Sequence, residues 1–456
     1  MTPVGHSISF KITFLLLIGL CNGIFGQGPS PAIPFNPDVK TGQLSNGLKY
    51  YILKNAKPEK KVELRLVVNA GSMMEDEDQL GLAHFMEHMN FNGLRHFPHN
   101  EVVHYLQSIG VKFGADLNAY TSFDETVYIL PVPSDNPNKV DSAFTILADW
   151  SGGALLDEKE IDNERGVVLE ESRLGKGADD RLFKQWFPKY MNGSRYGVRL
   201  PIGKDSIIKN FKYEALKRFH HDWYRPNLEC VIVVGDIDPI KAEQLIKDKF
   251  SGFTNPAFER TRPSQFDMPL RQKNEALVVS DPESQGMEIQ IFGNSYKSKP
   301  AITEADFKDR VVQSLFSSML AERYDELKNS ERPPFVYGMS YLESGYGRGW
   351  DNYASYAACG VDQAKFATQA LIREAMRVKK YGFTEKELER TKTNFLASYE
   401  HRFKEKDKTE SSRLVNELMR KFLVNAPSPG VDWAYHFIEK ILPTIQLSDL
   451  NVAAKK

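Results

Sequence analysis

The sequence has few cysteines, almost no net charge and a single long hydrophobic run. Three cysteines in 456 residues are too few for a disulfide framework. The 59 lysines and arginines balance 60 aspartates and glutamates, so nothing indicates nucleic acid or an anionic membrane as a partner. Beyond residue 27 no stretch is apolar enough for a transmembrane segment. These absences leave a globular protein, and a hydrophobic content of 41% is enough for sizeable cores.

The one hydrophobic run lies near the N-terminus. Phe14–Leu20 is too short to span a bilayer and follows Lys11, an arrangement typical of a secretory signal. We therefore interpret residues 1–27 as a signal peptide and expect an exported protein, periplasmic or secreted. A lipid anchor at Cys21 is the alternative, which Leu20 disfavours because it is not a small residue.

The residues from His84 to His88 read His-Phe-Met-Glu-His, the inverted form of a catalytic zinc motif. In a helix the two histidines lie one turn apart on one face, so both imidazoles can reach one metal ion. Glu87 lies beside them, where it can hold a water molecule that the metal activates. The alternative is a solvated helix, and a chance match has a probability on the order of one in a hundred.

A catalytic zinc site needs a third protein ligand and one open position. Glu164 and Glu171 are seven residues apart, so in a helix they face the same way, whereas Glu170 is rotated about 100° away. One of the pair would bind the metal and the other would support a ligand, and the spacing leaves both assignments open. An acidic surface helix is the alternative.

The periodicity divides the chain into two α+β domains. Residues 28–255 contain the motif and form the predicted catalytic domain. Residues 256–273 hold prolines without periodicity and read as a linker. Residues 274–456 repeat the same element types without the motif and form a second, inactive domain. We expect two structurally similar domains, each a mostly antiparallel sheet packed with helices.

Particular segments carry this prediction. A helix begins after Asn100 as a cap, and the later helix patterns cover 305–327, 362–380, 385–403 and 409–423. Strand patterns cover 62–68, 117–120, 126–132, 228–234, 276–279 and 287–292.

Two further segments join the motif in a family pattern. Asn118–Tyr128 reads NAYTSFDETVY, and Glu164–Glu171 reads ERGVVLEE. Together with the helix of His84–His88 they resemble the insulinase/pitrilysin family of inverted zinc metallopeptidases. The resemblance is specific from about residue 40 to 255 and looser to residue 456.

The resemblance implies a role for each site residue. His84, His88 and Glu171 would bind one Zn²⁺ per chain, Glu87 would be the general base, and Glu164 would be the supporting carboxylate.

The resemblance also implies that Asn118 and Ala119 hold the backbone of the substrate as an added edge strand. Main-chain pairing of that kind accepts any extended peptide. The alternative for Asn118 is a polar group at a strand end. Other histidines read as surface or packing residues, and His220 and His221 as an exposed helix end.

The sequence therefore predicts an exported zinc-dependent endopeptidase that hydrolyses short or unfolded peptides, with Glu87 as general base on a zinc-bound water. Two alternatives remain. One is a peptide-binding or scaffold half that becomes competent only with a partner half. The other is a metal-dependent hydrolase of a non-peptide substrate.

Family members close a chamber from two halves, and the second half supplies an arginine and a tyrosine. Arg323 and Tyr337 are the only loose match here, and Leu447–Lys456 reads as a helix without a stop signal. We therefore expect the N-terminal half of a longer, four-domain peptidase, whose partner is the C-terminal half of the same protein. A half-size enzyme that pairs with a homologous subunit is the alternative.

Overall fold

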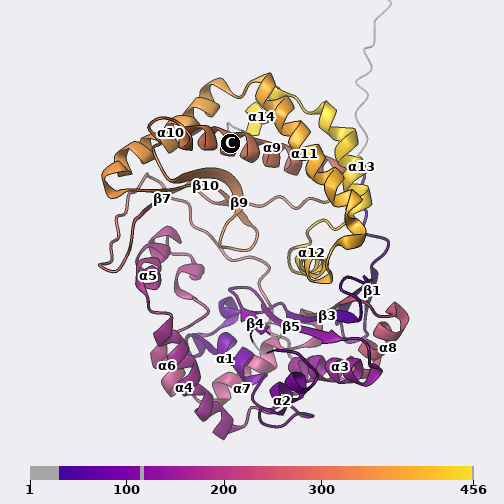
Figure 1. The fold of residues 1–456 in the computed structure, drawn as a ribbon. Coiled ribbons are helices and arrows are strands. Elements are labelled where there is room, and N and C mark those ends of the chain that lie inside the picture. The colour runs from indigo at the N-terminus through magenta and orange to yellow at the C-terminus, as the bar shows by residue number, and fades with distance from the viewer. Residues whose placement is uncertain (1–29, 113, 115–117, 454–456) are drawn as a thin grey trace, which may run out of the picture.

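Two sheets, each with its own helices, form the two lobes of the protein (Figure 1). The computed structural model describes residues 30–112, 114 and 118–453. The predicted signal peptide, with Cys21, lies outside the described residues, as does Leu117 of one predicted strand. The α+β class predicted from the periodicity is confirmed.

The first sheet has six strands in the order β1-β2-β6-β3-β5-β4. Only the pair β2 and β6 is parallel, and the other pairs are antiparallel. The central strands β3 and β6 are rich in valine, isoleucine and leucine and are buried on both faces. The strands are β1 Lys40–Gln43, β2 Lys49–Lys54, β3 Lys61–Val68, β4 Asn118–Thr121, β5 Thr126–Pro133 and β6 Glu229–Gly235.

Eight helices of the first lobe lie below this sheet in Figure 1 or flank it. They are α1 Leu82–Met89, α2 Glu101–Ser108, α3 Pro137–Gly152, α4 Glu158–Leu174, α5 Ala178–Tyr190, α6 Asp205–Asn210, α7 Tyr213–Trp223 and α8 Pro239–Phe250. Asn100 stands at the N-cap of α2 but its side chain makes no capping hydrogen bond, so that part of the prediction is wrong. Helix α3 instead begins with a true cap, since Asn136 accepts from Asn138 N.

The opposite face of the first sheet is covered by a helix from late in the chain. Helix α12, Ser411–Val424, lies on this face (Figure 1). Its Val415 and Leu418 belong to one buried cluster with Val67 and Ile232 of the sheet. Residues of the predicted second domain thus complete the core of the first lobe.

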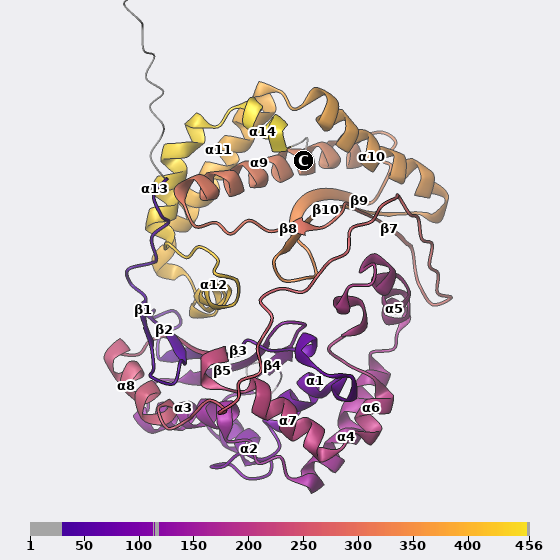
Figure 2. The same ribbon diagram turned by 180° about the vertical axis from the view of Figure 1, so that it is seen from behind.

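The second sheet is antiparallel and has four strands. Figure 2 shows the helices of this lobe on the side of the sheet that points away from the first lobe. The strands are β7 Met287–Phe292, β8 Tyr296–Lys297, β9 Tyr337–Ser344 and β10 Trp350–Cys359. The helices are α9 Glu304–Lys328, α10 Ala364–Tyr381, α11 Glu385–Lys404, α13 Val431–Ile441 and α14 Leu447–Ala453. None of the helices in the described ranges is both long and apolar enough to cross a membrane.

The strand predicted at Ala276–Val279 is wrong. This segment belongs to no sheet, and Leu277 and Val278 are 53% and 87% exposed. A strand needs a neighbour for its backbone groups, and no described strand lies beside this one. By contrast, the strand at Met287–Phe292 has the predicted bounds.

Candidate metal centre

Helix α1, which carries the His-Phe-Met-Glu-His motif, lies between the core of the first lobe and a pocket. Phe85, Met86 and Met89 are buried in the main core of the first lobe. The histidines, offset from these residues around the helix, project into a pocket. Burial of one side of the helix therefore fixes the direction in which the other side points.

A buried carboxyl group outside the helix caps its first turn. Glu75 Oε1 accepts hydrogen bonds from Gly81 N at 3.0 Å and Ala83 N at 2.8 Å. Gly81 has a φ of +102° and lies so close to Ile208 that a Cβ atom would come within 2.8 Å of its Cδ1. Because the first amides of a helix lack internal partners, Glu75 holds the start of α1 in place.

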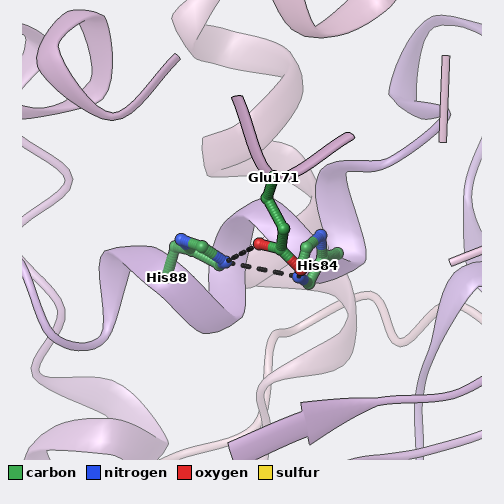
Figure 3. A group of neighbouring side chains, drawn as sticks. All are labelled: His84, His88 and Glu171. Carbon is green, nitrogen blue, oxygen red and sulfur yellow. Dashed lines mark hydrogen bonds and ion pairs between the residues drawn. The ribbon is translucent and has the colours of Figure 1, made fainter. Parts of the chain in front are cut away.

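His84, His88 and Glu171 meet in the pocket, as Figure 3 shows. The two Nε2 atoms are 3.2 Å apart, and the Glu171 carboxylate lies 3.6 Å from His84 Nε2 and 3.3 Å from His88 Nε2. A tetrahedral zinc ion with bonds of about 2.0–2.1 Å holds two ligand nitrogens about 3.3–3.4 Å apart. Two imidazole nitrogens and a carboxylate thus have the spacing and the chemistry that suit zinc.

Glu164 lies on the far side of His88 from Glu171. Its Oε1 is 2.7 Å from His88 Nδ1, and its Oε2 accepts from Asn92 Nδ2. A carboxylate at Nδ1 favours the tautomer with a proton there, which leaves the Nε2 lone pair directed at the pocket. Glu164 and Asn92 therefore orient His88.

The two glutamates around His88 favour a positive charge on its ring. Burial lowers the pKa of His88, but hydrogen bonds with Glu164 and Glu171 outweigh it and raise that pKa to about 9. Burial, followed by the charge of His88, lowers the pKa of His84 to about 4. Without a metal, His88 is thus protonated at neutral pH, and a metal ion bound at its Nε2 would replace that proton.

Glu87 lies beside the triad and is almost wholly buried. Burial raises the pKa of its carboxyl to about 7, against the opposing effect of a hydrogen bond that Thr121 Oγ1 donates to Oε2 at 2.6 Å. A carboxyl that changes protonation near neutral pH is suited to moving protons.

The pocket has a volume of about 760 Å³, and strand β4 forms one wall. Asn118 and Ala119 both line the pocket. Strand β4 is the edge strand of the sheet, so among the described strands only β5 pairs with it. Asn118 Oδ1 accepts from Ala119 N at 2.9 Å. Their predicted role in holding substrate stays a prediction.

Other residues named from the sequence lie elsewhere. Arg323 is buried in an ion pair with Glu387 at 2.6 Å, and neither Arg323 nor Tyr337 lines the pocket. His220 is not exposed as predicted: its Nε2 is buried and its ring stacks on Tyr224 with centroids 5.1 Å apart. The prediction holds for His221, whose side chain is 65% exposed, and fails for His220 because that side of the last turn of α7 packs inward.

Sequence reasoning assigned no role to Glu75, Asn92 or Thr121. Asn92 is four residues after His88, just beyond the end of α1, and Thr121 is two residues after Ala119, on the same side of the strand. Both spacings were visible signals. Glu75 gave none, since its contact with α1 depends on the path of the intervening loop.

Comparison with known proteins adds to this geometry. Residues 50–185 match insulinase, peptidase family M16, and residues 210–395 match the M16 inactive domain. A probable zinc protease PqqL of Escherichia coli K12 is 30% identical over 96% of this chain and 47% of its own length. A probable zinc protease PqqL of Haemophilus influenzae is 37% identical over 69% of this chain and 34% of its own. The chain therefore spans about a third to a half of these curated relatives.

Solved structures agree with the fold. The first half of the periplasmic protease PqqL from Escherichia coli superposes with a TM-score of 0.87 at 28% identity, covering 93% of this chain and 90% of that one. The whole PqqL protease superposes with a TM-score of 0.85, and 46% of it is covered.

The cap of α1 yields a prediction about stability and pH. Burial raises the pKa of Glu75 from 4.5 to about 8, although the amides of Ala83 and Gly81 lower it. The folded state therefore holds this proton more tightly than the unfolded chain, and stability is lost as pH rises through that window. Glu75→Gln keeps an accepting oxygen and cannot ionise. We expect its free energy of unfolding, measured by urea denaturation, to increase relative to that of the parent as the pH rises from about 5 to about 8.

Glu77→Gln is the matched control, because the Glu77 side chain is 81% exposed and its pKa is lowered, by a hydrogen bond from Arg199. Parallel pH profiles for the Glu75 variant and the parent would show that folding does not raise the pKa of Glu75.

Proposed function

The chain belongs to the insulinase family of peptidases (M16), and from that premise we propose that it is the zinc-binding part of an exported endopeptidase. The observation that carries the proposal is the convergence of His84, His88 and Glu171 in one pocket beside the buried Glu87. The relatives named as zinc proteases support the metal, and the solved relative named as periplasmic supports export.

His84 Nε2, His88 Nε2 and the Glu171 carboxylate would hold one zinc ion, with Glu164 orienting His88. When bound, zinc would polarise a carbonyl oxygen and make a water molecule more acidic. The donor set, with two nitrogens and one carboxylate, leaves an open position of the kind that catalytic zinc sites have.

Glu87 would accept a proton from the attacking water and pass it to the leaving amine. Thr121 would hold one oxygen of Glu87 and so fix the direction of the other. The outer edge of β4, at Asn118 and Ala119, would pair with the backbone of an extended peptide. Such pairing needs an extended segment, which supports short or unfolded peptides as substrates.

We also propose that a partner half completes the enzyme, either the remainder of a longer chain or a homologous subunit. The chain covers 46% of the whole PqqL structure, and 90% of the structure of its first half. Arg323 is already engaged with Glu387, so it does not supply a donor to the pocket. A scaffold role alone would not need the proton-accepting Glu87.

Replacement of the base tests the mechanism. Glu87→Gln cannot accept the proton, and we expect peptide turnover to fall by ~10²–10⁴-fold while zinc content is retained. Turnover should also stop when a chelator removes the metal from the parent. Undiminished peptide cleavage by a zinc-loaded Glu87→Gln protein would rule out Glu87 as the base. If a zinc-dependent non-peptide hydrolysis replaced peptide turnover, the peptidase assignment would be wrong.

Metal analysis tests the ligands. Glu171→Gln should lose most of its zinc, because a ligand is removed, whereas Glu164→Gln should weaken zinc about 10–100-fold, because His88 loses its orienting charge. Glu170→Gln is the control on the same helix, since Glu170 is exposed and pairs with Arg173. If Glu164→Gln strips the zinc and Glu171→Gln does not, the two roles are reversed.

A comparison of chain lengths tests the partner half. We expect residues 28–456 alone to bind zinc but to cleave peptides slowly. One missing oxyanion donor raises the barrier by about 2.7–4 kcal/mol, which corresponds to about 10²–10³ in rate. Turnover should rise by that order when the chain is joined to the remainder of its protein. An isolated monomer that matches the longer protein in rate would remove the need for a partner.

A further inference from the structure

The loop between β9 and β10 reaches from the second lobe to the turn that joins β4 to β5, directly after the strand that lines the pocket. Arg348 lies in this loop, and its side chain is only 10% exposed. Gly347, next to it, lies so close to Tyr196 that a Cβ atom would come within 2.9 Å of that ring. The loop is therefore seated tightly on the first lobe.

Arg348 forms hydrogen bonds with the turn that joins β4 to β5. Its Nη2 donates to Glu125 Oε2 at 2.6 Å and to the carbonyl oxygen of Asp124 at 3.1 Å, and its Nη1 donates to Asn69 Oδ1. Its backbone N donates to Tyr196 Oη at 3.0 Å, and that hydroxyl donates to Asp124 Oδ2 at 2.7 Å. The guanidinium thus makes charge-assisted bonds to two residues of the turn.

A second arginine reaches the same turn from outside the β9–β10 loop. Arg262 Nη2 donates to Asp124 Oδ1 at 3.2 Å and to its carbonyl oxygen at 3.3 Å. Asp124 is therefore partnered by two arginines and a tyrosine, while Glu125 receives its bond from Arg348.

The turn is short and is continuous with the functional residues. Ser122 N donates to Glu125 O at 2.8 Å, and Thr121 pairs with Thr126 directly before it. Thr121 holds Glu87, and Asn118 and Ala119 are on the same four-residue strand. An edge strand of this length pairs with β5 alone among the described strands, so the position of its turn decides the position of its side chains. Ser72 N and Met73 N also hold this turn, through Ser122 O at 3.1 Å and Phe123 O at 2.8 Å.

We propose that Arg348 is a positioning residue for the pocket: through the β4–β5 turn it fixes the strand that holds Glu87 and that would receive the peptide. The inference deepens the proposed peptidase function and rests on it. It gives the M16 inactive domain, which carries Arg348, a role in the geometry of the active one. A purely structural contact between lobes would stabilise the protein without acting on β4 in particular.

Amide hydrogen exchange on the zinc-loaded full chain tests the inference without any need for activity. In Arg348→Ala we expect a peptide that covers residues 118–126 to exchange about tenfold faster or more, with zinc content unchanged. Arg181→Ala is the matched control, because Arg181 also joins the lobes through two bonds to Asp281 at 2.6 and 2.7 Å but does not touch the turn. Arg348→Lys, which keeps the charge and loses the forked geometry, should show a smaller acceleration.

Kinetics then test the route through Thr121. Arg348→Ala should lower kcat/KM by about tenfold or more, and Arg181→Ala should leave it unchanged. If Arg348 acts through the strand, its effect should shrink in a Thr121→Val background, so that the two changes are not additive.

Three results would contradict the proposed role of Arg348. Exchange at residues 118–126 that equals the parent, or that Arg181→Ala accelerates equally, would overturn the inference, as would full additivity with Thr121→Val. If Arg348→Ala fails to fold, Arg348→Lys carries the same comparisons. Should the parent cleave no peptide, the proposed function fails, while the exchange result still judges whether Arg348 fixes β4.

Discussion

The hydrogen bond between His88 Nδ1 and Glu164 is the interaction on which the site depends. It joins α1 to α4, and these are the two helices that bring His84 and Glu171 together. It also selects the tautomer of His88, so that a lone pair points at the pocket. Without this bond the His88 ring could rotate, and either a protonated or an unprotonated ring nitrogen could face Glu171. The other contacts of the pocket refine an arrangement that this bond defines.

Two acidic side chains in and near the site are buried, although carboxyl groups usually lie in solvent. Glu75 and Glu87 are both buried carboxyls, and burial raises the pKa of each toward or above neutrality. One caps the helix that carries the motif, and the other lies where a proton would be moved. Burial thus lets Glu75 hold the start of α1 in place, and it gives Glu87 a pKa suited to proton transfer.

The two lobes are less separate than the periodicity implied. Helix α12 covers the face of the first sheet opposite the helices of the first lobe, and the β9–β10 loop holds the β4–β5 turn. The strand predicted at Ala276–Val279 failed for a related reason. A strand pattern specifies an extended backbone, but only a neighbouring strand makes it part of a sheet. His220 failed in the same way, because packing against Tyr224 is a tertiary contact.

By itself the sequence determined the local geometry. A spacing of four residues places His84 and His88 on one face of a helix, and a spacing of seven aligns Glu164 with Glu171. These are properties of the backbone period, and no other part of the chain is needed to read them. Spacing alone left the choice between the two glutamates open. Tertiary structure places Glu171 at the two Nε2 atoms and Glu164 at Nδ1, because the crossing of α1 and α4 sets which end of the imidazole each carboxylate reaches.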